Sequence, residues 1–331
     1  MNRHLVKLLA ALACLTWTLE VPAADSPLGS PSALVGRYTN NYEEAVRAAL
    51  PEVDSSAIVK VMEAVRVASA AEKPLVIVTV RDLEKFFSFR ERGLLNDSTY
   101  VDVGEAVYRF DSGAGRIYVA WRLGSVAPVA RKQFAAEIPA IRSAHDALIE
   151  RLGIPRQEVM FVDFREILSE TDGHPVLEKG VKGEIQSEGA TTTVLRAVAG
   201  VLVEGSYLRV SSVNGKRLAW LDMRWPIVRL SEATFASGFR APKDALEAIV
   251  KRVSASSGDL AVNVRMAVVL RPVDPARPTE FVPALKIGVQ PRTVKTDQGY
   301  RTDAGEVFYS DLVRGSPLVE PLLRDTVQSP R

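Results

Sequence analysis

The segment Tyr207–Pro226 reads YLRVSSVNGKRLAWLDMRWP and places two runs of alternating apolar and polar residues on either side of Asn214-Gly215. Asn-Gly between two such runs is the strongest short-range signal for a β-hairpin. The second run ends in Trp225 and Pro226, and proline cannot continue a strand inside a sheet. The segment therefore predicts an antiparallel hairpin with a large apolar face.

The two tryptophans of this segment are expected to lie on opposite faces of the second strand. Side chains alternate between faces along a strand, and Trp220 and Trp225 are an odd number of residues apart. Trp220 follows Leu218 by two positions, which favours the core for Trp220. Trp225 lies between Arg224 and Pro226, which favours a partner contact at a sheet edge.

A weaker copy of the hairpin lies upstream, at Tyr108–Pro128 (YRFDSGAGRIYVAWRLGSVAP). Trp121 and Trp220 both follow alanine, and each hairpin precedes a helical pattern that contains Asp-Ala-Leu, at Asp146–Leu148 and Asp244–Leu246. The spacing of the tryptophans and that of the Asp-Ala-Leu motifs differ by a single residue. This agreement predicts a duplicated hairpin-helix unit.

The remaining patterns favour an α+β fold, with antiparallel sheets and packed helices, over a doubly wound fold. Strands and helices come in unequal runs rather than in strict alternation. Apolar spacing predicts helices at 43–50, 55–71, 82–92, 131–152 and 242–254, and strands at 75–80, 158–168, 194–203, 259–270, 280–289 and 306–312.

The N-terminus has the organisation of a secretory signal peptide. Basic residues in Met1–Lys7 precede the uncharged apolar run Leu8–Leu19, and Val21-Pro22-Ala23-Ala24 supplies a cleavage site. We expect cleavage after Ala23 or Ala24 and a periplasmic or secreted product, which N-terminal sequencing tests. Cys14 leaves lipid attachment open as an alternative. No later apolar run reaches membrane-spanning length, so no stable membrane insertion is expected.

Charge and cysteine content exclude several classes of site. The chain carries 42 basic and 40 acidic residues, so no general attraction to nucleic acid is expected. Its single cysteine, Cys14, lies in the signal peptide, so the mature chain can form no disulfide, thiolate metal site or cysteine nucleophile. No cofactor is expected.

Composition suggests two domains joined by a polar, glycine-rich linker. The expected parts are a signal peptide at 1–24, a flexible tether at 25–40, a first α+β domain at 41–172, a linker at 173–193, a second α+β domain at 194–314 and a disordered tail at 315–331.

The stretch around the main hairpin resembles secreted PepSY and FTP-type domains. The resemblance rests on Val203-Glu204-Gly205, Asn214-Gly215 and Trp220/Trp225, with Phe281-Val282-Pro283-Ala284 similar to a later strand of that group. Leu285 stands where an aromatic residue is usual. The resemblance implies a cystatin-like arrangement of a helix on an antiparallel sheet and a binding or inhibitory role. It carries over no catalytic residue.

The densest group of potential metal ligands follows the predicted strand at 158–168. A solvated polar face explains these residues better than a metal site, because their spacing matches no EF-hand. If a metal binds, the expected ligands are Asp163, Glu170, Asp172 and His174. His145 is expected at a helix surface or start, since no nucleophile-elbow motif supports a catalytic triad.

Two further groups are candidates for partner contact. Phe86 and Phe89 belong to an aromatic cluster that is more often core than surface. The main hairpin is decorated with basic residues, and only convergence of several of them in space would create a site for an anion. These residues are Arg209, Lys216, Arg217, Arg224 and Arg229.

Three functions remain open from sequence. The first is an exported, soluble, non-catalytic binding protein, peptide-binding or protease-inhibitory, with Trp225, Arg224, Arg217, Phe86 and Phe89 as contacts. The second is a periplasmic hydrolase that uses Asp163, Glu166 and the His174 region. The third is a structural subunit of a cell-envelope assembly.

Overall fold

The computed structural model describes residues 38–71, 75–89, 101–124, 126–170, 185–215, 217–257, 260–274, 277–292, 294–296, 299–301 and 305–318. The chain forms two compact units. Unit 1 comprises Met1–Arg66, Leu230–Pro275 and Phe281–Arg331, and unit 2 comprises Val67–Arg229 with Ala276–Glu280.

This division differs from the one expected from sequence. Ile185–Val198 forms strand β6 of unit 2, although its residues 185–193 were expected to be linker. Its centre is Thr191-Thr192-Thr193, and β-branched threonine suits a pleated, half-buried surface. Polarity alone therefore misplaced the boundary. Residues 173–184 lie outside the described residues.

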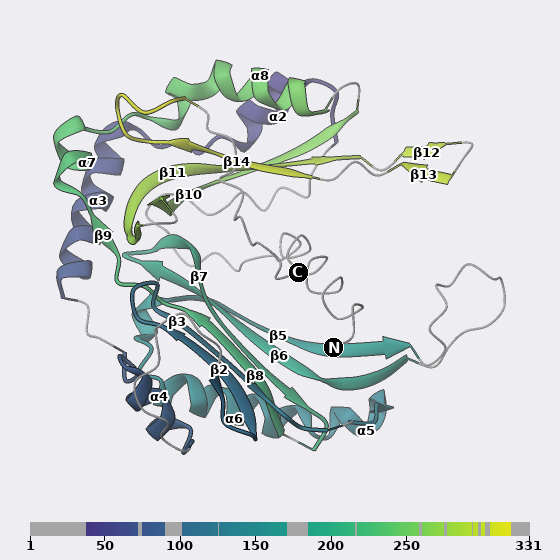
Figure 1. Cartoon of the computed structure of the whole chain (residues 1–331). Helices are drawn as coiled ribbons and strands as arrows, with labels where there is room; N and C mark the ends of the chain where they lie inside the picture. The colour runs from purple at the N-terminus through teal and green to yellow at the C-terminus, as the bar shows by residue number, and fades with distance from the viewer. Residues whose placement is uncertain are drawn as a thin grey trace. The chain divides into compact units, whose positions relative to one another are not determined.

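Unit 2 is built on one antiparallel sheet (Figure 1). The strand order is β1-β2-β3-β8-β7-β6-β5, and the short β4 also pairs with β6. The strands are β1 (Val101–Asp102), β2 (Ala106–Asp111), β3 (Arg116–Trp121), β4 (Val129–Ala130), β5 (Val159–Glu170), β6 (Ile185–Val198), β7 (Val201–Val213) and β8 (Arg217–Arg224).

Both predicted hairpins are present. Asn214-Gly215 begins the turn between β7 and β8, and Gly215 has a φ of 76°, which favours glycine. The upstream hairpin is β2–β3. Both hairpins belong to the same sheet, because β3 pairs directly with β8.

The predicted duplication requires Trp121 and Trp220 to occupy equivalent positions, and this prediction is wrong. Ala120 lies directly opposite Trp220 in the β3–β8 register, so these two residues share a face. Trp121, the next residue along β3, therefore lies on the other face. A duplication of the hairpin-helix unit is not supported by these positions.

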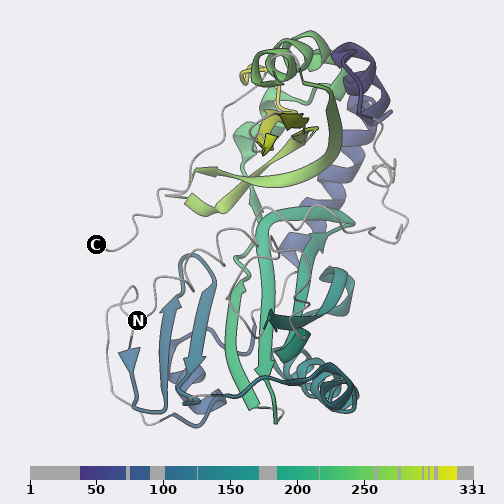
Figure 2. The ribbon, with the colours of Figure 1, turned by 90° about the vertical axis from the view of Figure 1, so that its right-hand side faces the viewer.

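Helices cover one face of the unit 2 sheet (Figures 1 and 2). They are α4 (Val80–Phe86), α5 (Arg131–Ala135) and α6 (Ile138–Arg151), and the 3-10 turn η1 (Arg156–Glu158) leads into β5. Leu83 of α4 and Leu148 of α6 join a core cluster with Val119, Val210 and Leu221 of the strands. We refer to this covered side as the core face and to the other side as the open face.

A β-bulge in β8 decides which tryptophan enters the core. Ser211 pairs with Trp220 and Ser212 with Leu218, so Ala219 is an extra residue in β8. The bulge shifts the alternation: Trp220 lies on the open face, whereas Leu221 and Met223 lie on the core face. Trp225 continues their phase and is buried (4% exposed). The prediction of a core Trp220 and an exposed Trp225 is therefore wrong.

Unit 1 contains the strands β10, β11 and β14 in that order, with α2 and α8 along one face (Figure 1). Ile249 and Val253 of α8 and Phe281 and Leu285 of β11 are buried. Its elements are α2 (Tyr42–Ala49), α3 (Ser55–Ala70), which continues beyond the unit, β9 (Arg229–Leu230), α7 (Glu232–Ser237), η2 (Pro242–Ala245), α8 (Leu246–Ser257), β10 (Val262–Asp274), β11 (Arg277–Pro291), β12 (Val294–Thr296), β13 (Gly299–Arg301) and β14 (Glu306–Asp311).

Other sequence expectations meet mixed outcomes. The helices expected at 43–50 and 55–71 are confirmed as α2 and α3. The expected buried strand at 75–80 is wrong: Val76 and Val78 are about half exposed, and Thr79 caps α4 through a hydrogen bond with the Asp82 backbone. The helix expected at 131–152 is two helices, α5 and α6.

Residues 25–37 of the expected tether and 319–331 of the expected tail lie outside the described residues. At the end of the expected tether, Thr39 forms an isolated antiparallel bridge with Val262. Among the described helices, none is both long and apolar enough for a membrane crossing.

Candidate functional site

The open face of the unit 2 sheet aligns polar and aromatic side chains from six strands in three rows. In an antiparallel pair, residues directly opposite each other point to the same side of the sheet. The first row is Asp111, Arg116, Arg224, Tyr207, Leu195 and Phe161; the second is Arg109, Tyr118, Asp222, Arg209, Thr193 and Asp163; the third is Val107, Ala120, Trp220, Ser211, Thr191 and Arg165.

Except for the buried Ser211, these side chains are at least partly accessible, and the alternate positions are packed. Arg109, Tyr118, Tyr207, Arg209 and Trp220 are of intermediate exposure. Their strand neighbours on the core face, such as Tyr108 and Leu208, are fully buried. The sheet therefore separates an apolar side from a side rich in arginine and aromatic residues.

Three arginines and two carboxylates occupy neighbouring positions at the centre of the open face, where Asp111 lies opposite Arg116 and Asp222 lies opposite Arg209. Arg116 and Arg224 are directly opposite each other, and Arg209 is directly opposite Asp222. We call Arg116, Arg209 and Arg224 the arginine cluster. Like charges directly opposite in a sheet are destabilising, so this arrangement has an energetic cost in the free protein.

One oxygen of the Asp222 carboxylate is already hydrogen-bonded to Tyr207. The Tyr207 hydroxyl donates to Asp222 Oδ2 at 2.9 Å, and the guanidinium of Arg209 lies 4.8 Å from the centre of the Tyr207 ring. Burial, then the Asp222 charge, raises the pKa of Tyr207 to about 12, so the phenol stays a neutral donor. The other oxygen, Asp222 Oδ1, lies 3.9 Å from Arg116 Nε, beyond hydrogen-bond distance.

Arg224 is placed over a glycine. A Cβ on Gly205, which has a φ of 71°, would lie 3.5 Å from Arg224 Nη1. The Arg224 guanidinium forms no hydrogen bond or ion pair with the part of the chain that the structure describes. The strand register places Arg116 and Arg209 beside Arg224 at neighbouring positions of the same face.

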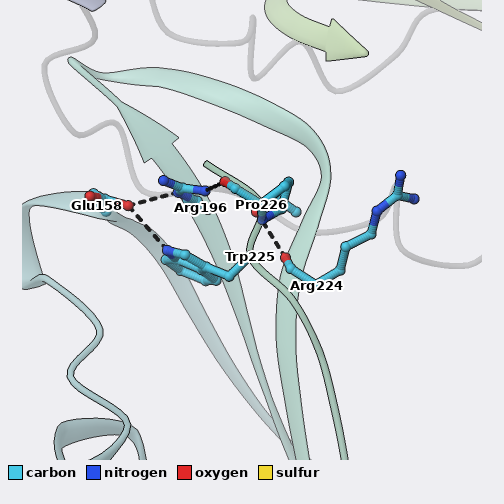
Figure 3. Close-up of polar contacts among 6 residues, drawn as sticks. Glu158, Arg196, Arg224, Trp225 and Pro226 are labelled. Atoms are coloured by element: carbon cyan, nitrogen blue, oxygen red, sulfur yellow. Dashed lines mark hydrogen bonds and ion pairs between the residues drawn. The ribbon is translucent and has the colours of Figure 1, made fainter. Parts of the chain in front are cut away.

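Trp225, the main sequence candidate for partner contact, belongs instead to a buried polar network (Figure 3). Its indole Nε1 donates to Glu158 Oε2 at 3.1 Å, and Arg196 Nε donates to the same oxygen at 2.7 Å. Arg196 is fully buried and also donates to the carbonyl of Pro226. The network joins η1, β6 and the end of β8.

The other predicted contacts are dispersed. Phe89 is buried (6% exposed) and stacks on Tyr108, so it cannot contact a partner. Phe86 is partly buried under the guanidinium of Arg151. Arg217 is exposed at the start of β8, where it donates to the carbonyl of Leu123. Of the five predicted contacts, only Arg224 and Arg217 lie on the open face, because Arg217 is directly opposite Val213.

The acidic residues predicted as metal ligands or catalytic groups lie on both faces of the sheet. Asp163 lies on the open face and pairs with Arg165, whereas Glu166 lies on the core face and pairs with Arg131. The side chain of Glu170, together with Asp172 and His174, lies outside the described residues. Within the described ranges no three potential ligands gather at one point. Asp163 and Glu166 do not converge as a catalytic pair.

His145 lies in the core, not at the helix surface as expected. Its Nδ1 is 2.7 Å from Thr192 Oγ1 and its Nε2 is 2.9 Å from Ser212 Oγ. The contact with Ser212 has the distance of a base and its nucleophile. Both side chains are buried, however, at 1% and 3% exposure, which favours a structural role for the pair.

This burial predicts a pH dependence of stability. Burial lowers the pKa of His145 from 6.5 to about 4, against the smaller opposite effect of Asp146. Between these values the unfolded chain binds the proton and the folded chain does not, so stability falls as the pH falls from about 6.5 towards 4. The loss reaches roughly 3 kcal/mol. Urea unfolding of the wild type and of His145→Gln should give a shallower pH slope for the variant; identical slopes would contradict the assignment.

Sequence reasoning missed Arg109, Arg116, Tyr118, Tyr207 and Asp222. The sequence does contain a signal for a polar sheet face. Alternate residues are apolar and the residues between them are charged or aromatic in three segments, Tyr108–Asp111, Arg116–Tyr118 and Tyr207–Arg209. What sequence could not supply was the pairing of β3 with β8, which brings the two hairpins together.

No family model, curated protein or solved structure matches the chain. The resemblance to PepSY and FTP-type domains stays a prediction.

Proposed function

We propose that the protein is an exported, non-catalytic binding protein that holds a peptide or protein partner on the open face of the unit 2 sheet. The observation that carries this proposal is the alignment of arginine, tyrosine and tryptophan side chains from adjacent strands on that face. These are the residue types enriched at protein interfaces and in binding hot spots.

The surroundings of the reactive groups support a binding role over hydrolysis. Asp163 and Glu166 lie on opposite faces, and His145 and Glu158 are engaged in buried hydrogen bonds. The signal peptide supports export, and the resemblance to secreted modules supports a binding or inhibitory role. No observation favours an envelope subunit.

The proposal can be tested with an immobilised peptide array, from which the mature protein should select peptides. Tyr118→Ala/Trp220→Ala should weaken binding of the selected peptides at least tenfold, about 1.4 kcal/mol, since aromatic residues dominate such contacts. Tyr38→Ala removes an exposed aromatic ring from unit 1 and serves as the matched control.

Unchanged binding by the double variant would contradict the proposed face. So would equal loss in the control. Thermal unfolding of each variant confirms that the fold is retained, because Tyr118 and Trp220 lie outside the core face.

A further inference from the structure

The arginine cluster carries more positive charge than its neighbours neutralise. Its three arginines face two carboxylates across the strands, Asp111 opposite Arg116 and Asp222 opposite Arg209. One Asp111 oxygen accepts the backbone N–H of Ala114, and one Asp222 oxygen accepts the Tyr207 hydroxyl. Neither Asp222 Oδ1 nor Arg116 Nε makes a hydrogen bond with the described residues, although both atoms are buried. Each guanidinium presents five N–H donors in a planar fork.

The strand register places the three arginines at neighbouring positions of one face. Side chains directly opposite in an antiparallel pair have Cβ atoms about 5 Å apart, which applies to Arg116 and Arg224. Arg209 lies on the next strand and is held against the Tyr207 ring. Two opposed arginines repel each other in the free protein. An anion that accepts hydrogen bonds from both guanidinium groups offsets this repulsion.

The third row of the open face, which contains Trp220, indicates a further property of the ligand. Val107, Ala120 and Trp220 are in register on three adjacent strands. Trp220 and Arg224 are four residues apart along β8, or about 14 Å at 3.4 Å per residue. A ligand that covers both rows therefore has an acidic end and an apolar end at that separation.

We propose that the arginine cluster is a subsite for a carboxylate of an acidic peptide, with the apolar side chains of the peptide against Trp220. This deepens and rests on the proposed function. An extended peptide of four to five residues spans the distance from the arginine cluster to Trp220. A free phosphate shares the oxyanion chemistry but would leave the Trp220 row without a role.

The test uses fluorescence anisotropy of the mature protein with labelled hexaglutamate, and with hexaglutamine as the neutral probe. We expect binding of hexaglutamate that weakens as salt increases, and at least tenfold weaker binding by Arg116→Gln/Arg224→Gln. Arg47→Gln is the matched control, because it removes one exposed charge from α2 of unit 1, outside the arginine cluster and the open face. It should change affinity less than threefold.

Several outcomes would overturn the subsite. They are equal binding of hexaglutamine, equal loss in Arg47→Gln, and competition by inorganic phosphate in a protein that does not bind hexaglutamate. The double variant should have a Tm equal to or above that of the wild type, since it removes a repulsive pair. If its Tm falls by more than a few degrees, the single variants Arg116→Lys and Arg224→Lys replace it. They keep the charge but lose the planar fork, and they should still bind hexaglutamate less tightly.

Failure of this inference can be told apart from failure of the proposed function. If array peptides bind through Tyr118 and Trp220 while the arginine variants bind them normally, the subsite falls and the binding face stands. If peptides are bound in neither experiment, both proposals fall.

Discussion

Glu158→Ala should lower the free energy of unfolding by about 3–5 kcal/mol, because it leaves the Arg196 guanidinium buried without its counter-ion. Arg196 is fully buried, and its Nε donates to Glu158 Oε2 at 2.7 Å. The same carboxylate accepts the indole N–H of Trp225, so the substitution also leaves a second buried donor without an acceptor. Urea unfolding measures the change.

The paired variant Glu158→Leu/Arg196→Met should recover part of this loss, since replacing both charges with apolar groups of similar size removes the buried unpaired charge. The indole N–H of Trp225 and the carbonyl of Pro226 still lose their partners. Glu43→Ala breaks an exposed ion pair with Arg47 and should cost less than about 1 kcal/mol. A small effect of Glu158→Ala, comparable to that of Glu43→Ala, would show that water reaches the network.

Trp225→Ala should cost about 3–5 kcal/mol, as large-to-small changes in a core do. The ring is 4% exposed and belongs to the core cluster of unit 2. Trp225→Phe keeps most of the ring area, loses the bond to Glu158 and should cost about 1 kcal/mol. Because Trp225 and Glu158 are in contact, the costs of their substitutions should not add.

Trp220→Ala is the matched comparison, and it should cost about 1 kcal/mol, since Trp220 is only partly buried on the open face. Denaturant unfolding of the two alanine variants decides between the core and surface assignments. Equal destabilisation by both would mean that the open face is covered and packed.

The two tryptophans also show where sequence reasoning reached its limit. Alternation correctly predicted the β7–β8 hairpin and the opposite faces of Trp220 and Trp225. It assigned the faces the wrong way round, because Ala219 adds one residue to β8 and reverses the phase after Leu218. A single-residue bulge leaves no clear mark in composition or spacing.

The candidate site was predictable only in part, for a related reason. The basic residues of the main hairpin were visible, including Arg209 and Arg224. Their partner Arg116 lies in a different hairpin, and only the β3–β8 pairing places it opposite Arg224. Local patterns predict which face of a hairpin is polar, but they do not predict which hairpins become neighbours.

That same β3–β8 pairing bears on the order of folding. Each hairpin can form early, since its strands are close in sequence, but the seam between them joins residues roughly a hundred positions apart. Closing so long a loop costs entropy before any contact compensates for it. During synthesis, the β2–β3 hairpin therefore has an exposed edge until β8 has emerged, and over that interval the edge can pair with another chain or bind a chaperone.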